Sequence, residues 1–189
     1  MNSRFSADKH FISTGTFLKQ EYKFPDLEKL LSKYDIILLV ARHWRVSNPQ
    51  QYGEYHIAKD WEMVRQIIKE RHPEYIPAFE KTMDHSNKSV GYNMFITHWE
   101  QFNAYSEWLF DILFEVEKRV PPIEDPIQSR IYGYMSERLI NVFCEHHRLR
   151  IKHIPLIMPF DDYKENMNIS NIHAAFRNSI NDLHYMINF

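Results

Sequence analysis

One arginine in this sequence lies where its charge needs a chemical explanation. From Ile127 to Val142, apolar residues recur at three- and four-residue steps, which predicts an amphipathic helix. At about 100° per residue, Arg138 lies within about 40° of the helix face marked by Ile131, Tyr134 and Val142. A guanidinium on an apolar face needs an anion. That anion is either the carboxylate of a structural ion pair or the phosphate or carboxylate of a ligand in a cleft.

Two further charged residues lie beside this arginine on the same predicted helix. Glu137 projects about 100° away from Arg138, on the helix edge that it shares with Arg130 and Asn141. This edge therefore places a carboxylate and a second guanidinium next to Arg138.

A basic segment directly follows the most apolar run of the chain. Residues 36–40 (IILLV) are fit for a buried strand, and Arg42 and Arg45 come immediately after it. Because ligands of α/β proteins collect at the carboxyl ends of strands, either arginine could meet a diphosphate. The alternative is a solvated basic loop. The segment is too short, in a chain of net charge −2, to indicate nucleic-acid binding.

His56 and Asp60 are four residues apart at the start of a predicted helix over residues 57–71. They share one face if that helix begins early enough, at the edge of its apolar stripe where a pocket wall could lie. Helix capping by Asp60, or an ordinary His–Asp pair, is the alternative. No further His or Cys stands at a metal-ligand spacing, so we predict no metal site in the protein itself.

Three blocks in order carry a resemblance to a known family. They are residues 91–96 (GYNMFI), 105–115 (YSEWLFDILFE) and 130–142 (RIYGYMSERLINV). Together they resemble a bacterial family of glycosyltransferase-like domains, long catalogued as a domain of unknown function, from capsule, exopolysaccharide and lipopolysaccharide loci. The resemblance is dense over residues 27–157, and its most distinctive part is the Ser-Glu-Arg-Leu segment that contains Glu137 and Arg138.

The resemblance implies a helix-rich α/β fold, a partial nucleotide-sugar-transferase-like (GT-A-like) domain with a small sheet flanked by helices. It implies a glycosyltransferase that moves a sugar from a nucleoside-diphosphate donor to a glycan acceptor in bacterial surface polysaccharide biosynthesis. Such chemistry needs a group that neutralises the diphosphate and a carboxylate that deprotonates the acceptor hydroxyl if the enzyme inverts.

By position in the family pattern, each candidate residue then receives a role. Glu137 or Asp60 would be the catalytic base. The candidate substrate-binding residues by this pattern are Arg138 for the diphosphate, Asn93 for sugar hydroxyls and His56 for the acceptor. Arg42, at the end of the apolar strand, and Arg130, on the helix edge of Glu137, complete the candidate set.

The sequence departs from the family pattern at its beginning. It resembles the C-terminal two-thirds of the family, whose full-length members carry a front half that helps to form the donor site. No Asp-x-Asp motif is present, although a divalent metal (Mn²⁺ or Mg²⁺) bound with the donor remains compatible with the sequence. We therefore expect either an enzyme whose front half comes from a partner chain, or a non-catalytic accessory module or truncated remnant on the same scaffold.

Periodicity and breakers predict the remaining elements and the domain limits. A capping box at Thr97 and Glu100 should start a long helix that ends at Arg119, and its aromatic residues should be covered on more than one side. Helical spacing over residues 73–83 and strand patterns over 91–97 and 151–157 complete the predicted domain, residues 23–160. Residues 1–22 should form a flexible arm, and residues 161–189 an amphipathic C-terminal helix.

Composition limits the class and the compartment. The chain has 189 residues, 44% apolar and 15% aromatic, with four glycines, which is typical of an ordered globular domain rather than a disordered chain. A single cysteine, Cys144, excludes an internal disulfide and favours the cytoplasm. No apolar run reaches the ~20 residues of a membrane span, and no signal peptide precedes the domain. We predict a cytoplasmic protein that could lie peripherally at the inner face of the membrane.

Overall fold

The structure is a computed structural model, which describes residues 9–19, 21 and 25–160. Its central sheet has the strand order β5-β2-β6, with β2 (Ile36–Leu39) in the middle. β5 (Phe95–Thr97) pairs antiparallel to β2, and β6 (Ile151–Ile154) pairs parallel to it. All four residues of β2 are buried, as the continuous apolar run predicted. β6 lies at an edge of this sheet, in agreement with the proline that follows it at position 155.

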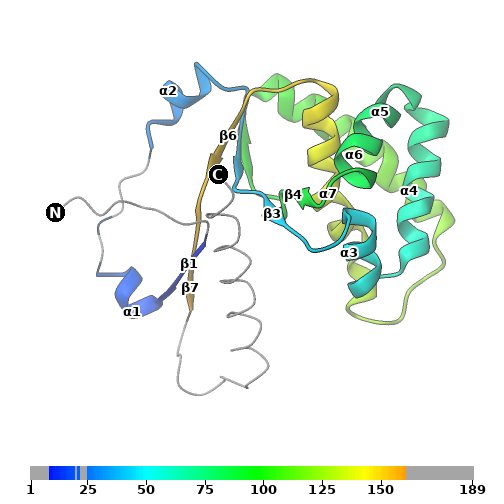
Figure 1. Ribbon diagram of the computed structural model, residues 1–189, viewed down its shortest axis with the longest axis horizontal. Helices are drawn as coiled ribbons and strands as arrows, with labels where there is room; N and C mark the ends of the chain where they lie inside the picture. Colours follow the sequence, from blue (N-terminus) through cyan, green and yellow to red (C-terminus); the bar gives the residue numbers. More distant parts are fainter. Residues whose placement is uncertain (1–8, 20, 22–24, 161–189) are drawn as a thin grey trace.

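Three long helices build the core beside this sheet. They are α4 (Ala58–Arg71), α6 (Trp99–Arg119) and α7 (Ile131–His146). They gather with α3 (Asn48–Tyr55) and α5 (Ile76–Phe79) on one side of the sheet (Figure 1). Their apolar stripes pack together around fully buried side chains that include Trp61, Ile112 and Leu139. The helix-rich α/β domain with a small sheet flanked by helices is therefore confirmed.

Short elements connect the long helices and the strands. α2 (Leu27–Leu31) and α3 (Asn48–Tyr55) stand on either side of β2 in the chain. After α4 come η1 (Pro73–Tyr75), α5 (Ile76–Phe79) and η2 (Glu80–Asp84), in the region predicted to be helical. β3 (Arg42–His43) and β4 (Lys88–Ser89) form an antiparallel pair, and η3 (Gln128–Arg130) leads into α7.

η2 is a π turn, in which the His85 amide donates to the Glu80 carbonyl five residues earlier. Thr82 donates its hydroxyl to the Ala78 carbonyl, a bond that bends helices. The Thr82 carbonyl in turn accepts a bond of 2.7 Å from the buried amide of Asn48 on α3. The local sequence and this tertiary contact together explain why the regular helix ends here.

Two expectations for α6 are wrong. The N-cap residue is His98 and the predicted box does not form, because the Thr97 hydroxyl donates at 2.6 Å to the carbonyl of Asp35, the residue before β2. Phe110 and Phe114 are half exposed instead of covered, so the helix is buried on one face only among the described residues. The predicted inner face is buried from Tyr105 to Val116, whereas Phe102, predicted as its first residue, is exposed.

The predicted N-terminal arm contains regular structure. β1 (Lys9–Ser13) pairs parallel with β7 (Leu156–Phe160), and α1 (Thr14–Phe17) follows β1. The predicted C-terminal helix, residues 161–189, lies outside the described residues. None of the helices in the described part of the chain combines the length and apolar character that crossing a bilayer requires.

Candidate functional site

A cavity of about 180 Å³ brings several of the predicted residues together. Arg42, His56, Glu137 and Arg138 all line it, although they are up to 96 positions apart in the sequence. Helix α7 supplies Glu137 and Arg138, and His56 caps the C-terminal end of α3. The remaining lining comes from the β3–β4 region and the loop after it: Trp44, Ser89, Val90, Gly91 and Tyr92, with Gln51 of α3 and Tyr134 of α7.

Arg138 is the most buried charge of this cavity, with 8% of its surface exposed. Its guanidinium donates to the Tyr134 carbonyl and to the Gln51 side-chain oxygen, both at 2.8 Å, and lies 5.0 Å from the centre of the Tyr52 ring. No ion pair joins it to a carboxylate within the described residues. Burial accordingly lowers the pKa of Arg138. The structural ion pair considered above is thus absent there, and neutral acceptors hold the charge in place.

Aromatic rings form one wall of the cavity. His56 stacks on Tyr134 with ring centres 3.9 Å apart and lies 4.9 Å from Tyr52. Burial lowers the pKa of His56, and the charge of Arg138 lowers it further, so the ring is neutral at pH 7. Its Nδ1 atom is buried without a hydrogen-bond partner in the described structure. A neutral imidazole with an unused nitrogen can bind a hydroxyl group.

Arg42 supplies a second guanidinium from β3. It donates to the Tyr92 hydroxyl and lies 4.9 Å from the Tyr92 ring and 5.9 Å from that of Trp44. Tyr92 has a φ of 67°, a left-handed conformation that is uncommon for a bulky residue and tends to be retained at functional sites. This conformation places the Tyr92 side chain against Arg42.

Helix α7 also fixes the loop that closes the cavity. The side chain of Asn141 accepts from the Val90 amide at 2.8 Å and donates to the Val90 carbonyl at 3.1 Å, as a neighbouring strand would. About one and a half helical turns earlier, the Ser136 hydroxyl accepts a hydrogen bond of 2.7 Å from the side-chain amide of Asn93. Asn93, a predicted sugar-binding residue, therefore anchors this loop to α7 and does not line the cavity.

Two other predicted residues also lie outside the cavity lining. Arg130 is exposed on η3, and its guanidinium lies 5.6 Å from the centre of the Tyr134 ring, the ring that stacks on His56. Asp60 is buried in the first turn of α4, where burial raises its pKa. His56 and Asp60 do not share a helix face. The condition for it fails, because α3 ends at Tyr55 and α4 begins at Ala58, which leaves His56 and Ile57 in extended backbone between the two helices.

Sequence reasoning missed the residues that hold the site together. Gln51 and Tyr52 carry no special pattern, and their relation to Arg138 across 87 positions is a tertiary contact. Asn141 offered one signal, because it shares the helix edge of Glu137 and Arg130. The lining contributes two guanidiniums and one carboxylate, which suits an anion better than a divalent cation. Within the described residues, no group of three or more His, Cys, Asp or Glu side chains could hold a metal ion.

The fold is that of a known glycosyltransferase structure. The chain is similar to the solved apo structure of the bifunctional glycosyltransferase WbbM, with a TM-score of 0.66 and 24% sequence identity. The match covers 84% of this chain and 30% of that chain, so this chain spans less than a third of its structural relative. The architecture is therefore a glycosyltransferase-like α/β domain.

The family follows from the sequence match. Residues 3–148 match the family described as a domain of unknown function (DUF4422), and the chain belongs to that family. No curated protein matches the chain. The sequence resemblance to a family of glycosyltransferase-like domains is supported by these two findings.

Proposed function

We propose that this protein is a glycosyltransferase that binds the diphosphate–sugar portion of a nucleoside-diphosphate sugar in the cavity at Arg138. The observation that carries the proposal is the Arg138 guanidinium, buried against the cavity and held by Gln51 and the Tyr134 carbonyl with no carboxylate partner among the described residues. A guanidinium has five N–H donors, of which these two bonds use two. A phosphate oxygen is the ligand that would use the others.

The other charges of the cavity support the same ligand. Arg42 provides a second guanidinium in the lining of the same cavity, so a diphosphate could be contacted by both arginines. The stacked pair of His56 and Tyr134 offers an apolar face of the kind that packs against a sugar ring. A volume of about 180 Å³ is below the usual size of a pocket for a whole cofactor, so we assign only the diphosphate and the sugar to it.

Glu137 is the catalytic base in this proposal. It is half buried at the cavity, next to Arg138 in the chain, and none of the ion pairs in the described residues includes it. The carboxylate would take the proton of the acceptor hydroxyl as that oxygen attacks the anomeric carbon. The bond from that carbon to the diphosphate oxygen breaks, and the two arginines offset the charge that develops on the leaving diphosphate. Asn93 and Arg130 would border the acceptor, while buried Asp60 has no place in this scheme.

The biological setting is part of the proposal. WbbM is named as a bifunctional glycosyltransferase, and the family resemblance points to surface polysaccharides such as capsule and lipopolysaccharide. We infer that this chain acts in such a pathway, in the cytoplasm. The single free cysteine, Cys144, agrees with a reducing compartment.

Thermal unfolding with a panel of nucleoside-diphosphate sugars tests this proposal, with and without Mn²⁺ or Mg²⁺. At ten times Kd, a donor should stabilise the fold by roughly 1.4 kcal/mol, which raises Tm by a few degrees. Arg138→Gln should abolish the shift. Lys118→Gln on the outer surface of α6 is the matched control and should retain it, since Lys118 contacts Glu115 on its own helix.

The absence of any shift from a wild-type chain that melts cooperatively would exclude the donor site. If a nucleoside-diphosphate sugar raises Tm, release of the nucleoside diphosphate in the presence of a glycan acceptor would then establish sugar transfer. Binding without turnover would instead assign the chain to the accessory, non-catalytic class.

A further inference from the structure

Helix α6 carries a row of exposed aromatic side chains. Trp99, Phe102, Phe110 and Phe114 expose 70%, 40%, 50% and 57% of their surface. Trp99 stacks on Phe102 with ring centres 5.4 Å apart, and the ring centres of Phe110 and Phe114 are 5.7 Å apart. The row therefore consists of two aromatic pairs, and we call these four residues the aromatic face of α6. Neither the family resemblance nor the proposed transfer reaction gives this face a role.

The four side chains lie on one side of the helix. At about 100° per residue, Trp99, Phe110 and Phe114 span about 60° of the helix circumference, and Phe102 lies about 60° beyond Trp99. Ser106 projects within about 20° of Trp99 and stands between the two pairs along the helix. A small side chain at such a position allows a second helix to approach to the usual interaxial distance of about 8–10 Å.

The size of the aromatic face is that of half a protein–protein interface. With roughly 200 Å² for each aromatic side chain, the four residues expose roughly 400 Å² of apolar surface. A contiguous apolar patch of this size is often functional. Because interfaces are about 60% apolar, this patch would be the apolar part of an interface of about 700 Å² on each partner. Stable complexes bury about 800 Å² on each partner.

The order of the side chains along α6 fits a second copy of the same helix. A two-fold axis requires a surface that is complementary to itself. Phe102 and Phe110 are each four positions from Ser106, and Trp99 and Phe114 are seven and eight positions from it. If two α6 helices cross in opposite directions at Ser106, Phe110 of one copy faces Phe102 of the other, and Phe114 faces Trp99. Each aromatic pair then packs against the other pair.

The charges of α6 agree with a protein partner. Glu100, Glu107 and Glu117 are exposed along the helix, which disfavours an anionic membrane surface as the occupant. Glu107 projects about 100° from Ser106, so the two Glu107 carboxylates of a dimer would lie at the rim. Water and salt screen their repulsion there.

We propose that the aromatic face of α6 is the interface of a homodimer, in which the α6 helices of two copies cross antiparallel with Ser106 at the two-fold axis. The aromatic side chains are already exposed in the single chain, so the interface forms without opening the core. The proposal is independent of the proposed glycosyl transfer, because no residue of α6 lines the Arg138 cavity.

Sedimentation velocity of the whole chain over a concentration series tests the dimer. We expect a species of twice the 23.0 kDa chain mass at about 100 μM, because interfaces of this size have dissociation constants in the micromolar range or below. Phe110→Glu places a charge against Phe102 of the other copy and should raise the dissociation constant roughly thirtyfold or more. Ile127→Glu is the matched control, since it adds the same charge at an exposed apolar side chain before η3. It should dimerise as the wild type does.

Disulfide formation tests the crossing point itself. In Ser106→Cys the two new thiols would face each other at the two-fold axis, within disulfide range for closely packed helices, so oxidation should link the two copies. Glu117→Cys is the matched control on the same helix. Its two thiols would be about 33 Å apart, at 1.5 Å per residue, and should not react. Cys144 is buried and should form no link in either variant.

Three results would overturn the proposal. The first is a wild-type chain that stays monomeric throughout the concentration series. The second is a dimer that Phe110→Glu, with an unchanged Tm, does not weaken, or that Glu117→Cys links as fast as Ser106→Cys, because the contact would then lie elsewhere. The third is a monomer that sediments with phosphatidylcholine vesicles and loses this binding in Trp99→Ala, which would assign the face to a lipid surface.

Discussion

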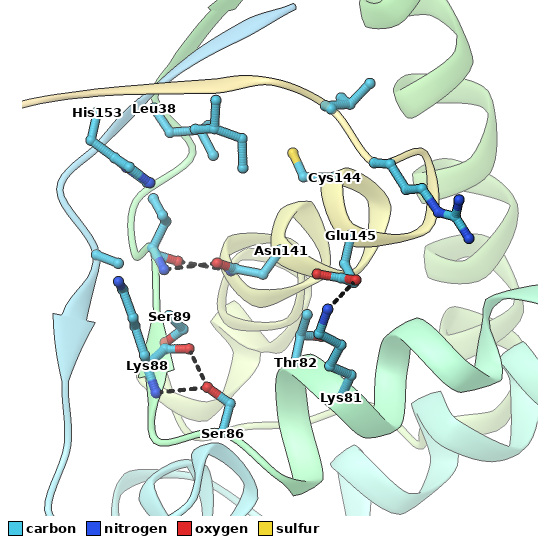
Figure 2. A pocket seen from close by; sticks show the side chains of 15 residues that line it. Leu38, Lys81, Thr82, Ser86, Lys88, Ser89, Asn141, Cys144, Glu145 and His153 are labelled. Carbon is cyan, nitrogen blue, oxygen red and sulfur yellow. Dashed lines mark hydrogen bonds and ion pairs between the residues drawn. The ribbon is translucent and has the colours of Figure 1, made fainter.

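The Arg138 cavity and a second, larger cavity of about 430 Å³ are both lined by Ser89 and Val90, yet they hold positive charge in opposite ways. The lining of the second cavity includes Lys81, Glu145 and Arg148 (Figure 2). In the first, the Arg138 guanidinium is buried and fixed by two neutral acceptors. In the second, the charges are carried on exposed side chains, and Lys81, with 69% of its side chain exposed, is paired with a carboxylate.

This difference shows what each cavity can do. A buried guanidinium that is oriented before the ligand arrives interacts through a low-dielectric environment and is little screened by salt. Such an arrangement suits the stabilisation of charge that develops during a reaction. Exposed lysines lose less hydration and are screened by salt, which suits reversible binding of an anion. The buried charge of the first cavity is the observation on which its proposed catalytic role rests, whereas the charges of the second cavity are open to solvent and salt.

Loss of the two hydrogen bonds that hold Val90, which lines both cavities, should have the largest effect. Asn141→Ala deletes both bonds to Val90, whose amide and carbonyl would remain buried without partners at 3% exposure. We expect a loss of about 3 kcal/mol in the free energy of unfolding, and weaker binding of the nucleotide sugar in the first cavity. Urea denaturation measures the loss. Asn93→Ala, which removes one bond from an exposed residue of the same loop, is the control and should cost less than about 1 kcal/mol.

A double substitution should separate the structural cost of Arg138 from its proposed role. Arg138→Met alone leaves the buried Gln51 side chain without its donor, which should cost about 2 kcal/mol. Adding Gln51→Leu removes both partners and should restore most of the stability. Neither variant should show the rise in Tm that a nucleoside-diphosphate sugar causes in the wild type. A double variant that regains stability and still binds the nucleotide sugar would contradict the assignment of Arg138 to the diphosphate.

The strain at Arg148 should produce a smaller effect of the opposite sign. Arg148 follows the end of α7 in a left-handed conformation, with φ 52°. Arg148→Gly relieves this conformation, so the free energy of unfolding should rise by about 0.5 to 1 kcal/mol. Arg148→Ala retains the strain and is the matched control for loss of the side chain. Equal stability of the glycine and alanine variants in urea denaturation would show that the backbone here is not strained.

Protonation of His56 gives the smallest predicted effect and reports on the first cavity alone. Burial and Arg138 lower the pKa of His56 in the folded state below its usual 6.5. The unfolded chain therefore binds the proton more readily, and His56 contributes stability above pH 6.5 that is lost as the pH falls through the folded pKa. A bound diphosphate should raise this pKa, because its negative charge offsets Arg138.

NMR titration of the histidine ring protons, with and without a nucleoside diphosphate, measures this shift. The spectrum of His56→Gln identifies the resonance. A His56 pKa that does not change with saturating ligand would argue against a diphosphate beside Arg138.

The sequence by itself determined the elements and which of their faces are buried. The apolar run of residues 36–40 became the central strand, and the helical spacing around Arg138 placed that charge in the core as expected. Cys144 is a buried free thiol whose pKa burial raises to about 12. These properties depend on local backbone geometry, since a period of 3.6 residues or a continuous apolar run fixes which side chains share a face. The grouping of Arg42, His56, Glu137 and Arg138 was also predicted, on the basis of a family resemblance.

Only the tertiary structure decided the partners of those side chains. Arg138 faces Gln51 from a helix 87 positions away, and Asn141 faces the backbone of Val90, 51 positions away. The predicted capping box failed for the same reason, since the Thr97 hydroxyl donates to the carbonyl of Asp35, which directly precedes the paired strand β2. The second cavity arises where a π turn, a strand pair and a helix end meet, and no local pattern encodes that meeting. Periodicity states which side of an element is buried, whereas the identity of each contact depends on how all the elements pack at once.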